Sequence, residues 1–121
     1  MTLNEFRREM KAYWQAVNEE ADELRDSYIA RNRMHDLYRK FDDDERAMAD
    51  HVLAEWVLSK DEGMRSIAQS LIGEFRIINA IPALAQLAKR LPSSRSPGAP
   101  WELEYVNRII AELSRGASPR R

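Results

Sequence analysis

Apolar residues recur at helical spacing along most of this 121-residue chain. Between residues 61 and 76 the intervals between apolar positions are 3, 1, 3, 1 and 3, at Met64, Ile67, Ala68, Leu71, Ile72 and Phe75. This spacing places the side chains on one face of an α-helix, which has a period of 3.6 residues. No segment alternates convincingly with the period of two that a half-buried strand requires. The pattern therefore predicts an all-α fold.

The first apolar stripe is the longest, because its positions repeat every seven residues from Leu3 to Tyr28. It predicts one amphipathic helix over about residues 2–28. Such a stripe either packs on the rest of its own chain or forms the seam of a two-chain coiled coil. Glu20 interrupts the seven-residue repeat. We therefore expect internal packing, with a homodimer through this helix as the alternative.

Capping residues mark the later helix starts. Asp42 is followed three residues later by Glu45, which is the spacing of a capping box. Ser59 or Asp61 is expected to begin the next helix, because short polar side chains satisfy the free N–H groups of a first turn.

The C-terminal part of the chain contains all of its glycine and proline residues. Asn79 is expected to open another helix, with Pro82 in its first turn, where a missing N–H costs no hydrogen bond. Residues 92–100 read as a loop before a final helix. Residues 115–121 are expected to form a flexible tail.

An internal repeat relates two successive helix pairs. The four apolar positions within residues 34–41 recur 34 residues later, and the four within residues 49–56 recur 35 residues later. A third copy begins near Val106 and lacks its second helix. A period of this length built from helix pairs is typical of an α-solenoid.

Residues 61–91 resemble a HEAT-like repeat. The resemblance rests on Asp61-Glu62-Gly63-Met64-Arg65, Ala68, Leu71-Ile72-Gly73 and Asn79-Ala80-Ile81-Pro82-Ala83-Leu84. That family has an arginine early in its first helix, small residues where the two helices cross, and an Ala-Ile-Pro-Ala-Leu type of opening to its second helix. The match covers about a quarter of the chain. It implies a short curved stack whose concave side binds proteins, and it implies no catalytic residue.

Together these features predict an all-α, short α-solenoid of HEAT-like helix pairs with a long N-terminal amphipathic helix. Residues 1–28 form that helix, which packs on the repeats, residues 29–114 form the HEAT-like repeats, and residues 115–121 form the tail. Gly73 and Ala68 are expected to let two helices approach closely.

The composition lacks the groups that most reaction chemistries use. There is no cysteine, which removes disulfides, thiolate zinc sites and cysteine nucleophiles. The only histidines are His35 and His51. His51 shares a helix face with Glu55 and follows Asp50, but a solvated histidine beside a carboxylate is the expected arrangement. No nucleophile elbow or glycine-rich phosphate loop is present. We therefore expect no enzymatic activity, no cofactor and no bound metal.

The charge is nearly balanced overall, with a net charge of −1, but it is unevenly distributed. Residues 42–62 contain eight acidic and two basic side chains, a local charge of −6 that would repel phosphate. No basic stripe and no membrane-spanning apolar stretch is present. The first ten residues carry charges where a signal peptide would be apolar. We expect a cytoplasmic protein that binds neither nucleic acid nor membrane.

The sequence favours a non-enzymatic protein-interaction module with a partner that is basic. One alternative is a toxin-neutralising immunity protein, because bacterial proteins of that class use acidic helical faces against basic clefts. A base-modifying or lyase activity is the other, and it would need a basic groove or a polar pocket around His51. The candidate contact residues are Asp43, Asp44, Asp50, Glu55, Asp61, Glu62, Arg65, Glu74, Arg76, Trp101 and Tyr105.

Overall fold

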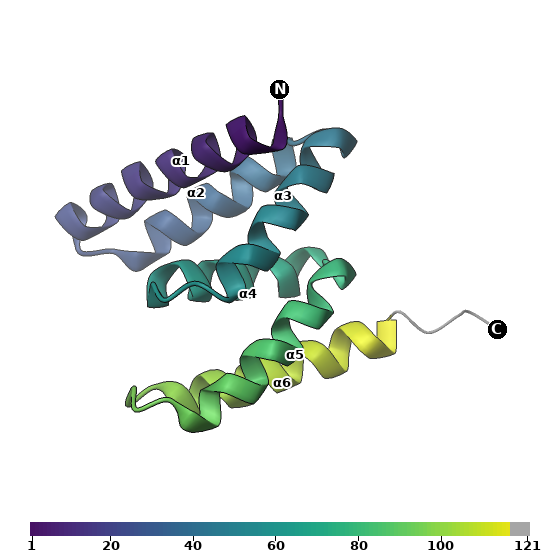
Figure 1. The fold of residues 1–121 in the computed structure, drawn as a ribbon. Helices are drawn as coiled ribbons and strands as arrows, with labels where there is room; N and C mark the ends of the chain where they lie inside the picture. The colour runs from purple at the N-terminus through teal and green to yellow at the C-terminus, as the bar shows by residue number, and fades with distance from the viewer. Residues whose placement is uncertain (117–121) are drawn as a thin grey trace. The chain divides into compact units, whose positions relative to one another are not determined.

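A computed structural model describes residues 1–116 and confirms the all-α fold, with no strand in that range. The elements are α1 (Leu3–Leu24), α2 (Ser27–Lys40), α3 (Asp43–Val57), α4 (Glu62–Phe75), the 3-10 helix η1 (Ile78–Ala80), α5 (Ile81–Arg90), the 3-10 helix η2 (Leu91–Ser93) and α6 (Ala99–Gly116) (Figure 1). The chain divides into two compact units, Met1–Val52 and Leu53–Arg121, with the boundary inside α3. None of the helices described is long and apolar enough to cross a membrane.

The predicted C-terminal tail falls partly inside the structure. Residues 115 and 116 belong to α6, so the expected start of the tail at residue 115 is wrong. The remaining tail residues, 117–121, lie outside the described residues.

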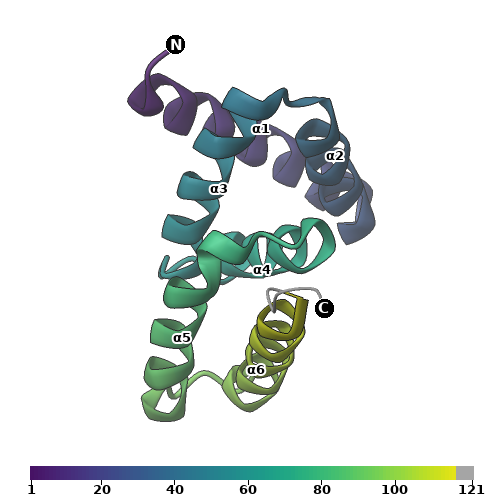
Figure 2. The same cartoon turned by 90° about the vertical axis from the view of Figure 1, so that its right-hand side faces the viewer.

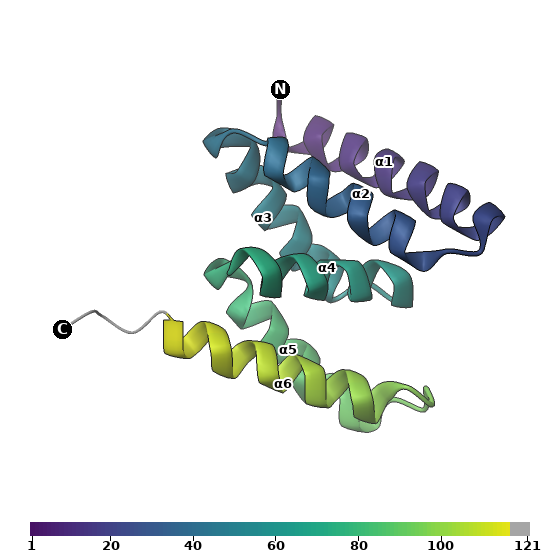
Figure 3. The same cartoon turned by 180° about the vertical axis from the view of Figure 1, so that it is seen from behind.

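The first unit contains the antiparallel hairpin of α1 and α2, which lie side by side in Figure 1 and Figure 3. The prediction of one helix over residues 2–28 is wrong at its C-terminal end. Arg25 takes the left-handed conformation with φ 54° and ends α1, and the Asp26 side chain accepts a hydrogen bond from the Tyr28 N–H at 3.0 Å. Tyr28 therefore belongs to α2, where it is 66% exposed. Helices commonly end at a glycine in the left-handed conformation, which other residues rarely adopt. Because an arginine occupies this position, the sequence contains no indication that the helix ends here.

The apolar stripe of α1 is buried within the chain, and aromatic contacts tie it to the end of α2. The Phe6 and Phe41 ring centroids lie 5.2 Å apart, and Phe41 also contacts Tyr38 at 6.0 Å. Such tilted ring pairs add to the free energy of area burial. The buried stripe residues are Phe6, Met10, Trp14, Val17 and Ala21.

The helix starts follow the capping residues in two of three cases. Asp42 and Glu45 form the predicted capping box, with reciprocal side-chain bonds of 2.8 and 2.9 Å to each other's N–H. Asp61 caps α4 by accepting from the Met64 N–H at 3.1 Å. Asn79 does not cap α5, because η1 precedes that helix and no side chain caps its start. Pro82 occupies the first turn of α5 as predicted.

The second unit contains α4, α5 and α6. Figure 2 shows η2 and the following loop joining the end of α5 to the start of α6. Among residues 1–116 no helix follows α6, as predicted for a third copy without its second helix. The apolar face of α6 packs against α5 and α4 and buries Val106, Ile109 and Leu113. The most extensive helix–helix contacts are those of α1 with α2 and of α5 with α6, whereas the sequence repeat pairs α2 with α3 and α4 with α5. The solenoid arrangement stays a prediction.

Gly73 does not mark a close helix crossing. A Cβ atom built there would lie 3.8 Å from Cγ1 and 3.9 Å from Cδ1 of Ile109, which is ordinary van der Waals contact. Glycine inside a helix costs roughly 0.5–1 kcal/mol relative to alanine, mainly through backbone entropy. We therefore expect Gly73→Ala to raise the free energy of unfolding by about 0.5 kcal/mol, measured by urea denaturation.

Gly63→Ala is the matched control for this substitution. Gly63 lies in the first turn of the same helix and has open space where its Cβ would be. A loss of stability in Gly73→Ala alone would show that α4 and α6 need the glycine after all.

Candidate functional site

A cluster of three polar side chains joins α4 to the start of α6. Arg65 donates from Nε to Glu102 Oε2 at 2.9 Å and from Nη2 to Glu102 Oε1 at 3.1 Å. Gln69 donates from Nε2 to the same Oε2 atom at 2.7 Å. The side chains of Arg65 and Glu102 are each only 14% exposed. This bidentate ion pair holds the first turn of α6 against α4.

Both members of the ion pair are charged at neutral pH. Burial alone would raise the pKa of Glu102, but the hydrogen bonds from Arg65 and Gln69, together with the guanidinium charge, outweigh it and lower that pKa. The hydrogen bond to Glu102 is also the largest cause of the raised pKa of Arg65. The cluster is therefore a stable ionic contact between two helices.

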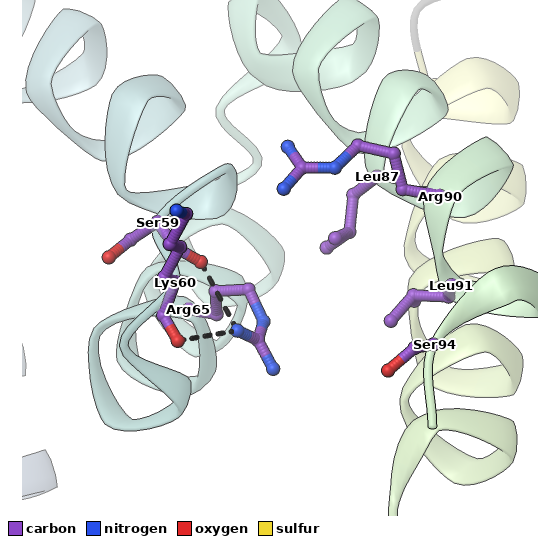
Figure 4. Close-up of a pocket in the computed structure, with 7 residues that line it drawn as sticks. All are labelled: Ser59, Lys60, Arg65, Leu87, Arg90, Leu91 and Ser94. Atoms are coloured by element: carbon purple, nitrogen blue, oxygen red, sulfur yellow. Dashed lines mark hydrogen bonds between the residues drawn. The ribbon is translucent and has the colours of Figure 1, made fainter. Parts of the chain in front are cut away.

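Arg65 also organises the loop between α3 and α4. Its Nη1 atom donates to the carbonyl oxygens of Ser59 at 3.1 Å and Lys60 at 3.2 Å. Beside these contacts lies a pocket of about 240 Å³ (Figure 4). Its lining residues are Ser59, Lys60, Arg65, Leu87, Arg90, Leu91 and Ser94.

Two aromatic side chains project from α6 next to the ion pair. Trp101 is 73% exposed, and Tyr105, one turn further along, is 38% exposed. We call these two residues the exposed aromatic pair. Glu102 follows Trp101 directly in the chain, so the backbone that carries the tryptophan is anchored by the contact to Arg65.

The acidic candidates are divided between the two units, because the acidic segment crosses the boundary inside α3. Asp43 and Asp44 are exposed in the first turn of α3, in the first unit. In the second unit, Asp61 and Glu62 are exposed at the start of α4. Glu55 is exposed in the last turns of α3. Carboxylates at helix N-termini are favourable by themselves, so helix stability accounts for the first four residues.

Asp50 is not a free surface carboxylate. It accepts a hydrogen bond from the Tyr38 hydroxyl at 2.7 Å, and burial raises its pKa above the usual value. The Arg46 guanidinium carbon lies over the same Tyr38 ring, 5.2 Å from its centre. Asp50 therefore belongs to the packing of α3 on α2.

The three candidates on and after α4 have different roles. Arg65 holds Glu102, whereas Arg76 ends α4 in the left-handed conformation with φ 53° and donates to the Glu112 carbonyl oxygen at 3.3 Å. Glu74 is exposed near the same end of the helix. Arg65 and Arg76 are separated by about three helical turns, so they do not form one compact site.

The sequence patterns single out neither Glu102 nor its partner Gln69 as a candidate. A signal was present, because Glu102 precedes Val106 and Ile109 by four and seven residues and thus lies on the buried face of α6. Gln69, in turn, lies four residues after Arg65 on α4. Polar residues on an apolar stripe indicate a buried polar contact, but they do not identify the partner.

The histidines do not form a metal site with neighbouring carboxylates. His51 is exposed on α3 and His35 is buried on α2. In the part of the chain that the structure describes, no group of three or more His, Cys, Asp or Glu side chains could hold a metal ion.

Comparison with known proteins provides no relative: no family model, no curated protein and no solved structure matches this chain significantly.

Proposed function

We propose that this chain is a non-enzymatic protein-interaction module that contacts its partner through the exposed aromatic pair on α6. The observation that carries the proposal is the 73% exposure of Trp101 on a regular helix. Tryptophan is the largest apolar side chain and is enriched among residues that dominate binding energy at protein interfaces. A partner that covers Trp101 and Tyr105 would gain the free energy of burying both rings.

The support beneath the aromatic pair favours binding. Glu102 is held by two hydrogen bonds from Arg65 and one from Gln69, and Val106 is completely buried one turn later. Because the helix is fixed, only the side-chain rotamers of the aromatic pair lose freedom on association. Such preorganisation reduces the entropic cost of binding.

This proposal shifts the emphasis from the acidic segment to α6. Capping and helix-dipole effects account for Asp43, Asp44, Asp61 and Glu62, and Asp50 is bonded to Tyr38. Neither capping nor packing against another helix explains why a tryptophan occupies position 101, where the side chain is 73% exposed. The resemblance of residues 61–91 to a HEAT-like repeat supports the same class of function, because that family binds proteins.

The test begins with a photo-crosslinking amino acid at position 105, which identifies the partner in cells. Binding of the purified partner is then measured by calorimetry with the wild-type chain and with Trp101→Ala. We expect Trp101→Ala to weaken binding by about 30-fold or more, the effect of losing a central aromatic contact.

Tyr28→Ala is the control, because Tyr28 is a 66% exposed aromatic residue in the first unit. It should leave the dissociation constant within about twofold of the wild-type value, as expected for a residue outside the contact. If Trp101→Ala also binds with wild-type affinity while remaining helical by circular dichroism, α6 is not the contact surface.

A further inference from the structure

The pocket beside Arg65 has an excess of positive charge that the fold does not use. Lys60 and Arg90 both line it, and neither has an ion-pair partner among residues 1–116. Arg65 is different, since Glu102 neutralises its charge, with Asp61 and Glu62 acting on it more weakly. The net attraction of the pocket for an anion therefore comes from Lys60 and Arg90.

The charged side chains of Lys60, Arg65 and Arg90 line the same pocket. Figure 4 shows Lys60 and Arg65 on one side of the pocket and Leu87, Arg90, Leu91 and Ser94 on the other, with the Arg90 guanidinium extending toward the first side. Arg65 directs four hydrogen bonds to Glu102, Ser59 and Lys60. Because a guanidinium carries five N–H groups, one of its donors remains.

An apolar wall accompanies the charges. Leu87 is 3% exposed and Leu91 is 5% exposed, so both are firmly packed while they contribute to the pocket lining. The pocket volume of about 240 Å³ lies below the range of roughly 300–1,000 Å³ that is usual for drug-sized ligands. A small molecule with one anionic group and a short apolar group matches this combination.

We propose that this pocket binds such a ligand, a phosphate monoester or a carboxylate, with Arg90 and Lys60 contacting the anionic group and Leu87 and Leu91 contacting the apolar group. The Arg65–Glu102 pair holds the loop that carries Lys60 in place. This ligand site is separate from the exposed aromatic pair and does not depend on the proposed protein partner.

The experiment is a nuclear magnetic resonance titration of the full chain with phenyl phosphate, inorganic phosphate and butanoate. We expect saturable shifts confined to the backbone amides around Lys60 and residues 87–94. Phenyl phosphate binding alone would identify a phosphate ligand, and butanoate binding alone a carboxylate ligand. Both outcomes support the site, whereas shifts that do not saturate for any of the three compounds would overturn it.

Matched variants separate a specific site from general charge attraction. Arg90→Ala is expected to weaken binding of the better ligand by about tenfold, as for loss of one charge-assisted hydrogen bond. Lys89→Ala removes the same charge from the same last turn of α5 but does not line the pocket, and it should change affinity less than twofold. Equal weakening by both variants would overturn the proposal.

Leu91→Val tests the apolar wall with little risk to folding. It should weaken phenyl phosphate or butanoate binding while leaving inorganic phosphate binding unchanged, because inorganic phosphate has no apolar group. An equal effect on all ligands would contradict the assigned role of Leu91.

Discussion

Replacing Glu102 with alanine should lower the free energy of unfolding by about 3 kcal/mol. The substitution removes the acceptor of three hydrogen bonds and leaves the mostly buried guanidinium of Arg65 and the amide of Gln69 without their partner. An unpaired buried charge costs far more than an exposed one, because water cannot replace the lost carboxylate. Urea denaturation followed by circular dichroism measures the loss.

Glu104→Ala provides the comparison within the same helix. Glu104 is 77% exposed, and its oxygen lies 3.7 Å from the Arg108 guanidinium. Exposed pairs of this kind contribute roughly 0–1 kcal/mol, so this variant should stay close to wild-type stability. If the two variants lose similar amounts of unfolding free energy, the Arg65–Glu102 contact stabilises the fold no more than an exposed ion pair does.

The same ion pair predicts an acid dependence with a definite sign. Because the pKa of Glu102 is lowered in the folded protein, its stabilising effect is present above the ordinary value of 4.5 and is lost as the pH falls through the folded-state pKa. Glu102→Gln removes this titration. The difference in stability between wild type and Glu102→Gln should therefore shrink as the pH falls below 4.5.

Phe6→Ala is expected to have the largest effect, a loss of about 4 kcal/mol in the free energy of unfolding. Phe6 is 5% exposed and its ring contacts Phe41 at 5.2 Å, so truncation leaves a cavity and removes an aromatic pair. Thermal denaturation monitored by circular dichroism measures this loss. Tyr28→Ala, at a 66% exposed position, should stay within about 0.5 kcal/mol of wild type.

The burial of the α1 stripe within one chain supports internal packing, and the dependence of stability on protein concentration tests the predicted dimer alternative. If the α1 stripe is internal core, the melting temperature of the wild-type chain should not depend on concentration. A melting temperature that rises with concentration, and a loss of this dependence in Phe6→Ala, would show that the stripe forms a seam between two copies.

Local chemistry in the sequence determined the helical class and much of the element pattern. The apolar period predicted helices rather than strands, and the spacing of Asp42 and Glu45 predicted the start of α3. The start of α4 was predicted at Ser59 or Asp61, and Asp61 is the residue that caps it. These features succeed because helix periodicity and capping involve residues within one or two turns of each other.

The tertiary structure alone decided which helices meet and which side chains form the candidate sites. Arg65 and Glu102 are 37 residues apart in the sequence. The end of α1 at Arg25 lacks the glycine that usually indicates a helix end. Contacts between distant residues depend on how whole helix faces pack, and one amphipathic face accepts many partners. For that reason the sequence predicted which residues lie on the apolar face of a helix, but it did not predict which helix packs against that face.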